Sequence, residues 1–127
     1  MLNQPRPQKS LHWFDPRNRT ISTWGFILNR ITALGLTLYL ALHLYMLSKL
    51  TQGPEAYNAF IALAKTPVIK FGELLVIAAG LIHGINGIRI ALNSFGIGTR
   101  YQKVMLISAM VIAFGLTAFF GYAMFAE

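Results

Sequence analysis

The stretch from Pro67 to Leu92, PVIKFGELLVIAAGLIHGINGIRIAL, decides the fold class of this chain. A helix rises about 1.5 Å per residue, so this length covers a bilayer's hydrocarbon core, which is about 30 Å thick. Nearly all of its side chains are apolar. Pro67 suits the first turn of a helix, where the missing backbone N–H is not needed. The stretch is therefore predicted to span a membrane.

Two further apolar stretches, residues 25–50 and 103–126, flank this one and are long enough to cross the bilayer. Residues 55–65 lie between the first two spans and are predicted to form a short helix at the membrane interface. We therefore expect an all-α integral membrane protein with three transmembrane helices. It forms a single membrane-anchor domain, preceded by a polar arm over residues 1–24.

The composition supports a membrane protein and excludes several other classes. Of the 127 residues, 55% are hydrophobic and 12% are charged, whereas soluble domains carry about 25% charged residues. The net charge of +7 does not form a basic stripe among polar residues, so nucleic acid is not an expected partner. The chain has no cysteine, which excludes disulfides, thiolate-bound metal and thiol catalysis.

The basic residues predict the orientation of the chain, because cytoplasmic loops are enriched in Lys and Arg. Eight of them lie in the arm, at the entrance to the first span or at the boundary between the second and third spans: Arg6, Lys9, Arg17, Arg19, Arg30, Arg89, Arg100 and Lys103. Three lie at the opposite ends of the spans: Lys49, Lys65 and Lys70. We expect the N-terminus in the cytoplasm and the C-terminus outside.

The arm also bears on localisation. It has no apolar core of the kind that signal peptides need, and its prolines fit a transit peptide poorly. The prediction is a multi-pass protein of a prokaryotic cytoplasmic membrane.

His83 is the most informative polar residue, because a polar side chain within a span is costly and usually functional. Gly80, Gly84 and Gly87 lie near it at helical spacing and leave room for a flat, bulky group. A neutral imidazole can ligate haem iron. Alternatively, the small residues serve close helix packing and His83 hydrogen-bonds to a neighbouring span. The spacing alone leaves both hypotheses open.

Arg89 follows His83 by six residues, roughly 9 Å nearer the cytoplasmic side of the helix. A guanidinium there is suited to the anionic propionates of a haem. The alternative is an arginine that simply extends to the interface at a helix end.

His43 lies thirteen residues beyond Arg30, roughly 20 Å into the membrane. If Arg30 and Arg89 lie at equal depth, His43 and His83 differ in depth by roughly 11 Å. That offset excludes one shared iron but suits two haems stacked across the bilayer. The alternative is a histidine that hydrogen-bonds to another span or lies near the outer interface.

Asn29 and Arg30 stand at the cytoplasmic entrance of the first span, one turn before Thr32. A cation with amide and hydroxyl donors at a membrane edge suits a quinone headgroup or a haem propionate. Trp24 is a nearby candidate for the same quinone site. The alternative for Arg30 is a positively charged topological anchor.

Lys70 and Glu73 lie three residues apart in the outer part of the second span. We expect them to pair with each other or with a partner subunit. A role for Glu73 in proton transfer is a further hypothesis.

The polar pattern resembles a known family. Residues 83–89, followed by Phe95-Gly96, are similar to the second-span signature of the cytochrome b subunit of succinate dehydrogenase. Residues 26–32 resemble the family's first-span signature, although Phe26 and Asn29 stand where the signature has serine and histidine. The resemblance extends over nearly the whole chain, including the three-span layout.

The resemblance implies a role in respiratory electron transfer. His83 would ligate haem b, Arg89 would contact a haem propionate, and Arg30 would contact a propionate or quinone. His43 matches the histidine that ligates a second haem in some members. The implied partners are a flavoprotein subunit, an iron–sulfur subunit, ubiquinone or menaquinone, and a second hydrophobic anchor that supplies the opposite haem ligand.

Three other functions remain open. The same chain would serve a quinol:fumarate reductase, since the direction of catalysis depends on the reduction potential of the quinone. A haem-free anchor would use its histidines only for packing. A small transporter or channel would need polar residues along several spans, and the third span has no Asp, Glu, Lys, Arg or His between Val104 and Phe125. The chain alone is not expected to catalyse a reaction.

Overall fold

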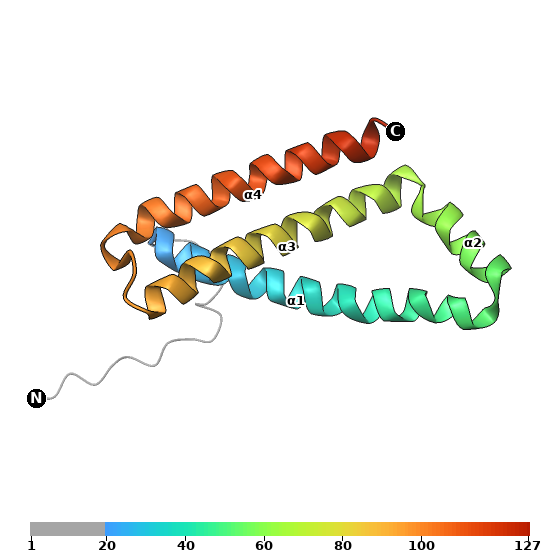
Figure 1. The fold of residues 1–127 in the computed structure, drawn as a ribbon, viewed down its shortest axis with the longest axis horizontal. Helices are drawn as coiled ribbons and strands as arrows, with labels where there is room; N and C mark the ends of the chain where they lie inside the picture. Colours follow the sequence, from blue (N-terminus) through green and yellow to red (C-terminus); the bar gives the residue numbers. More distant parts are fainter. Residues whose placement is uncertain (1–19) are drawn as a thin grey trace, which may run out of the picture.

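A computed structural model describes residues 20–127 and contains three long helices joined by shorter ones (Figure 1). Their order is α1 (Ile21–Leu47), η2 (Ser48–Gln52), α2 (Pro54–Ala64), α3 (Pro67–Ser94), η3 (Thr99–Tyr101) and α4 (Gln102–Phe125). The described residues include three helices that are long and apolar enough to cross a membrane. The predicted all-α, three-span architecture is therefore confirmed, and the predictions made for residues 1–19 lie outside the described part.

Local sequence explains where the helices begin and end. Thr20 caps α1, because its hydroxyl accepts a hydrogen bond from the Thr23 backbone N–H at 3.3 Å. The helix consequently starts at Ile21, a few residues before the predicted first span. Pro54 and Pro67 occupy the first turns of α2 and α3. The link before α2 turns at Gly53, whose φ of +100° is a conformation that favours glycine.

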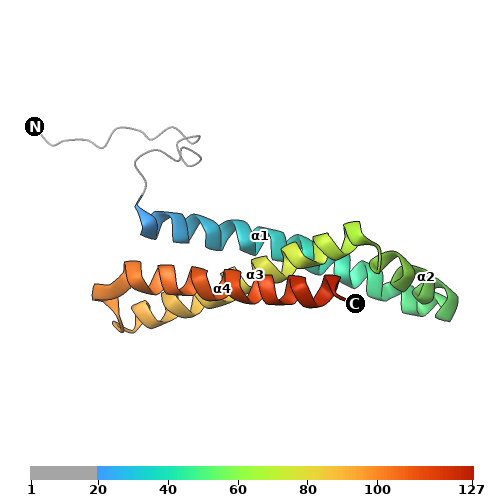
Figure 2. The same cartoon turned by 90° about the horizontal axis from the view of Figure 1, so that it is seen from above.

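The long helices alternate in direction, and α3 packs between the other two. Figure 1 shows the start of α1 beside the turn that joins α3 to α4, whereas α2 and the C-terminus lie at the opposite end. In Figure 2, α3 crosses α1 and α4 obliquely. Because α1 and α3 meet near the start of α1 and separate towards α2, the C-terminal half of α1 has little cover within the chain.

The distribution of polar and apolar side chains is the reverse of a soluble protein's. Among the described residues, the buried apolar side chains are Leu106, Ala109 and Ala113, all from α4. Thr32, Asn86 and Arg89 are the buried polar ones. Most large apolar side chains are exposed, as expected where lipid or another membrane subunit covers the surface. The interior between α1 and α3 is therefore where the polar chemistry lies.

Candidate functional site

His83 of α3 faces α1, and the Nδ1 atom of its ring makes the central contact of the site. Nδ1 lies 3.0 Å from the backbone carbonyl oxygen of Asn29 and 3.3 Å from the Thr32 hydroxyl. The Thr32 hydroxyl in turn donates to the Leu28 and Asn29 carbonyl oxygens at 2.7 and 3.0 Å. Because a carbonyl oxygen only accepts, the contact with Asn29 requires a proton on Nδ1.

This assignment leaves the other ring nitrogen of His83 with a free lone pair. Nε2 makes no hydrogen bond with any residue in the described part of the chain. An Nδ1–H that donates to a backbone carbonyl is the arrangement that orients metal-ligating histidines. Space is also present, since a Cβ added at Gly84 or Gly87 would meet nothing within 4 Å. The interhelix bond and the capacity to ligate iron therefore coexist at His83.

Asn86 joins α3 to α1 one turn nearer the α3–α4 turn than His83. Its side chain is fully buried. Nδ2 donates to the Gly25 carbonyl oxygen at 2.9 Å, and Oδ1 accepts from Arg89 Nε at 2.8 Å. Sequence analysis assigned no role to Asn86. Asn86 lies three residues from both His83 and Arg89, so it is a neighbour of each on the helix surface, and this spacing was the signal that could have found it.

Arg89 is 7% exposed, so it does not extend from the helix end to the interface as the alternative hypothesis required. Its guanidinium lies beside Gly25 and Leu106. A Cβ added at Gly25 would stand 3.3 Å from Arg89 Nη2 and 2.9 Å from Leu106 Cδ1. The absence of a side chain at Gly25 thus makes room for the guanidinium between α1 and α4.

Arg30 and Trp24 occupy different sides of α1. The guanidinium of Arg30 stacks over the Phe26 ring at 4.4 Å from its centroid. Six residues separate Trp24 from Arg30, which at about 100° per residue puts them about 120° apart around the helix. The residues predicted for one quinone site therefore lie in different surroundings: the Asn29 carbonyl oxygen contacts His83, whereas Trp24 lines a groove between α1 and α4.

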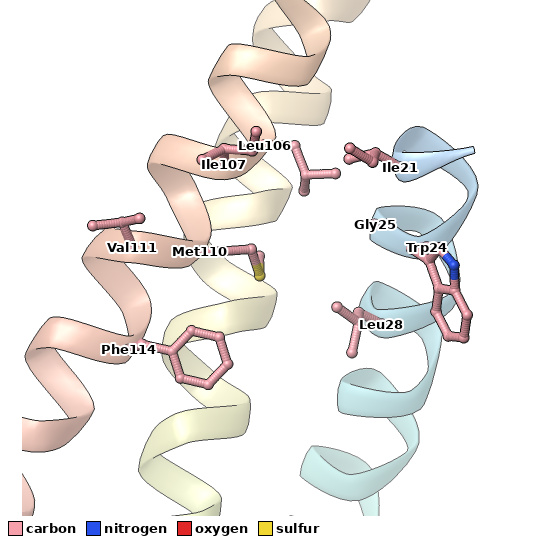
Figure 3. A pocket seen from close by; sticks show the side chains of 9 residues that line it. All are labelled: Ile21, Trp24, Gly25, Leu28, Leu106, Ile107, Met110, Val111 and Phe114. Atoms are coloured by element: carbon pink, nitrogen blue, oxygen red, sulfur yellow. The ribbon is translucent and has the colours of Figure 1, made fainter. Parts of the chain in front are cut away.

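Trp24 lines an apolar groove of 580 Å³ between the first halves of α1 and α4 (Figure 3). Ile21 and Leu28 point across it towards α4. The remaining lining residues are Gly25, Leu106, Ile107, Met110, Val111 and Phe114. The groove offers almost no hydrogen-bonding group, so it does not resemble a headgroup site.

His43 lies on the exposed C-terminal half of α1, with its ring 5.4 Å from that of Tyr39. Since His83 lies level with Asn29, His43 is fourteen residues further along α1, or about 21 Å. This offset exceeds the roughly 11 Å expected from the sequence. The expectation assumed equal depth for Arg30 and Arg89, whereas Asn86 and Arg89 lie against Gly25.

Lys70 does not pair with Glu73. Its ammonium group donates to the Met124 carbonyl oxygen at 3.1 Å, near the C-terminal end of α4. A cation at this position satisfies a free carbonyl of the helix end. Glu73 makes no ion pair with the residues the structure describes. No group of three or more His, Cys, Asp or Glu side chains suited to a metal ion occurs among them either.

Comparison with known proteins identifies the family. The description "Succinate dehydrogenase/Fumarate reductase transmembrane subunit" belongs to the family profile that matches residues 4–122. The chain belongs to this family. It is 35% identical to the succinate dehydrogenase 2 membrane subunit SdhC of Mycobacterium tuberculosis over 102 residues, covering 80% of this chain and 71% of the relative. It is 27% identical to the succinate dehydrogenase hydrophobic membrane anchor subunit of Halobacterium salinarum over 90 residues, covering 70% and 69%.

As a succinate dehydrogenase/fumarate reductase transmembrane subunit, the chain serves as a membrane anchor within a larger complex. This chain carries the polar interior just described on three apolar helices. In this anchor, three polar residues of α3 lie against α1: His83, Asn86 and Arg89. Their contacts on α1 are Gly25, Asn29 and Thr32. The contact between α1 and α3 is therefore the site on which a functional proposal rests.

Proposed function

We propose that this chain is the haem-b-binding membrane anchor of a succinate:quinone oxidoreductase, through which electrons pass from an iron–sulfur subunit to quinone. A flavoprotein subunit would oxidise succinate, and this chain would hold the peripheral subunits at the membrane together with a second hydrophobic anchor. The N-terminal end of α1 would face the cytoplasm, in keeping with the eight basic residues on that side.

The observation that carries the proposal is the hydrogen bond between His83 Nδ1 and the Asn29 carbonyl oxygen. It sets the tautomer in which Nε2 offers a lone pair, and it holds the ring against rotation. Gly84 and Gly87 leave open space on the helix that carries this ring. A fully packed histidine with both nitrogens bonded would have argued for a structural role instead. The residues present thus fit a haem ligand.

A bound haem would supply a one-electron redox centre within the membrane. The tasks of this chain's own residues follow from their positions. The Asn29 carbonyl orients the imidazole, and the Arg89 guanidinium is available to neutralise a propionate. Arg30, on the exposed side of α1, would contact a quinone headgroup. His43 lies about 21 Å along α1 from the level of His83, too far to hold the same haem, so any further ligand to that haem would come from the second anchor.

Two alternatives share the fold. A quinol:fumarate reductase anchor would use the same residues, and the family description covers both enzymes. A haem-free anchor would keep the His83–Asn29 bond for packing alone. Neither alternative has an observation that favours it over the proposal, whereas the free Nε2 atom favours haem ligation.

The test is the absorbance of the purified complex. The complex is isolated through a tag on this chain, and the dithionite-reduced minus oxidised spectrum is recorded, with haem quantified against flavin. A b-type signal at one haem per flavin supports the proposal with His83 as ligand. Two haems per flavin would add His43 as ligand of the second. Flavin without haem would refute haem binding and leave the anchor role, and loss of both would refute the oxidoreductase assignment.

A further inference from the structure

The side chain of Asn86 joins α3 to α1 and also holds the buried arginine, Arg89. We propose that Asn86 is a positioning residue that acts through Arg89: it fixes the guanidinium where it influences the redox centre bound at His83. This inference rests on the proposed function and adds a residue to which that function assigns no part.

The carboxamide of Asn86 has a fixed orientation. Nδ2 donates to the Gly25 carbonyl oxygen at 2.9 Å, and Oδ1 accepts from Arg89 Nε at 2.8 Å. Exchanging the two ends of the amide would set oxygen against oxygen and N–H against N–H, so only one orientation satisfies both neighbours. Because the side chain is fully buried, water cannot replace either bond without a cavity. The contact therefore determines the direction of the Arg89 side chain at Nε.

The position of Arg89 is also restricted on its other side. Gly25 has no side chain, and a Cβ there would stand 3.3 Å from Arg89 Nη2 and 2.9 Å from Leu106 Cδ1. The guanidinium thus lies in a narrow space bounded by α1, Asn86 and Leu106. An arginine side chain ordinarily has many rotamers, and this enclosure removes most of them.

The remaining donors of Arg89 are available for an anion. Within the described part of the chain, neither Nη1 nor Nη2 donates a hydrogen bond, and no carboxylate pairs with the guanidinium. A charged group at 7% exposure within a span normally has a counter-charge. Arg89 lies six residues from His83, about 9 Å along α3. A carboxylate of the group bound at His83 is the counter-charge that this distance and chemistry favour.

The proposal predicts an electrostatic effect, because a fixed cation favours the state that has gained an electron. Loss of the cation by Arg89→Gln should lower the midpoint potential of the haem. Asn86→Leu removes both amide bonds at similar volume and frees the guanidinium to move to the interface. Asn86→Leu should therefore also lower the haem midpoint potential, although Asn86 itself is uncharged. A residue needed only for stability would reduce the yield of complex without this shift.

A double-mutant cycle on the haem midpoint potential of the intact complex tests the inference. We expect Asn86→Leu to lower the potential in the wild-type background and to add no shift to Arg89→Gln. Asn93→Leu is the matched control, since Asn93 lies on the same helix and its buried Oδ1 has no hydrogen-bond partner among the described residues. This control should leave the potential unchanged.

Three results would overturn the inference while haem binding stands. The first is a haem midpoint potential that Asn86→Leu leaves unchanged. The second is a double variant in which the potential shifts of Asn86→Leu and Arg89→Gln add. The third is a loss of haem in Asn86→Leu although Arg89→Gln retains it. If Asn86→Leu does not assemble, Asn86→Ser is carried through the same cycle with the same expectation. A wild-type complex without haem would instead refute the proposed function, and the inference with it.

Discussion

The Nδ1 atom of His83 lies 3.0 Å from the backbone carbonyl oxygen of Asn29, a residue on another helix and 54 positions earlier in the chain. A backbone carbonyl cannot be removed by substitution at Asn29, so the orientation of this imidazole depends on how α1 packs against α3 and not on one partner side chain.

His83→Ala should abolish the b-type signal of the complex, or halve it if two haems are bound, because no other described histidine lies within reach of the same iron. Flavin should still co-purify, since the apolar surfaces of the three helices are unchanged. The reduced minus oxidised spectrum of the purified complex measures this. His43→Ala is the companion variant. If the wild-type complex holds one haem per flavin, this variant should keep the full b-type signal; if it holds two, the variant should lose half of the signal. An unaltered spectrum in His83→Ala would exclude His83 as a ligand.

Arg30→Gln should reduce kcat/KM for quinone by about tenfold to a hundredfold, as expected when one hydrogen bond from a charged donor is lost. The haem signal should persist, because Arg30 lies about 100° around α1 from Asn29, which faces His83. Succinate oxidation by an artificial acceptor at the flavin should be unchanged. Equal losses with quinone and with the artificial acceptor would contradict a quinone contact at Arg30.

Gly25→Ala should destabilise the subunit, whereas Gly35→Ala should not. The added Cβ at Gly25 meets Leu106 at 2.9 Å and Arg89 at 3.3 Å, but at Gly35 it meets nothing within 4 Å. Overpacking of this kind costs roughly 1–3 kcal/mol. Thermal denaturation of the complex in detergent compares the two variants. Equal midpoints would show that α1 adjusts freely at Gly25.

Lys70→Met should weaken the attachment of α4 to the start of α3, because the Met124 carbonyl loses its donor. A loss of about 1 kcal/mol is expected for one such bond. Lys65→Met is the control. The Lys65 side chain is exposed, lies at the same end of the helix bundle as Lys70, and makes no hydrogen bond with the described residues. Limited proteolysis of the C-terminal end provides the measurement. Identical cleavage rates in both variants would argue against a stabilising role for Lys70.

The fold was predictable because length and hydropathy alone define a membrane span. The short helix at Pro54–Ala64 was predictable too, since Gly53 and Pro54 mark its start. The start of α3 could be predicted from its proline, and α1 and α4 from their apolar runs, without knowledge of packing. These features depend on local sequence, and the membrane allows few alternatives to a helix.

The site was predictable residue by residue but not in its arrangement. His83 and Arg89 stood out because polar groups within a span are costly. The relative depth of α1 and α3 was not predictable, because it depends on which carbonyl Asn86 meets. That contact sets Asn86 against Gly25, and so moves His43 further from the level of His83 than expected. The expected pair between Lys70 and Glu73 was wrong for the same reason: the acceptor of Lys70 within the chain is a main-chain oxygen on α4, which no side-chain pattern reveals.

The sparse apolar interior has a consequence for biogenesis. Each of the three long helices is apolar enough to be stable in a bilayer alone, so insertion and association are separable stages. Association then depends on small-residue contacts such as Gly121 against Leu74 and on the polar bonds at Asn86 and His83. A chain that has lost these bonds would therefore keep its three spans in the membrane, while α1 and α3 would separate and expose the polar groups of α3 to lipid.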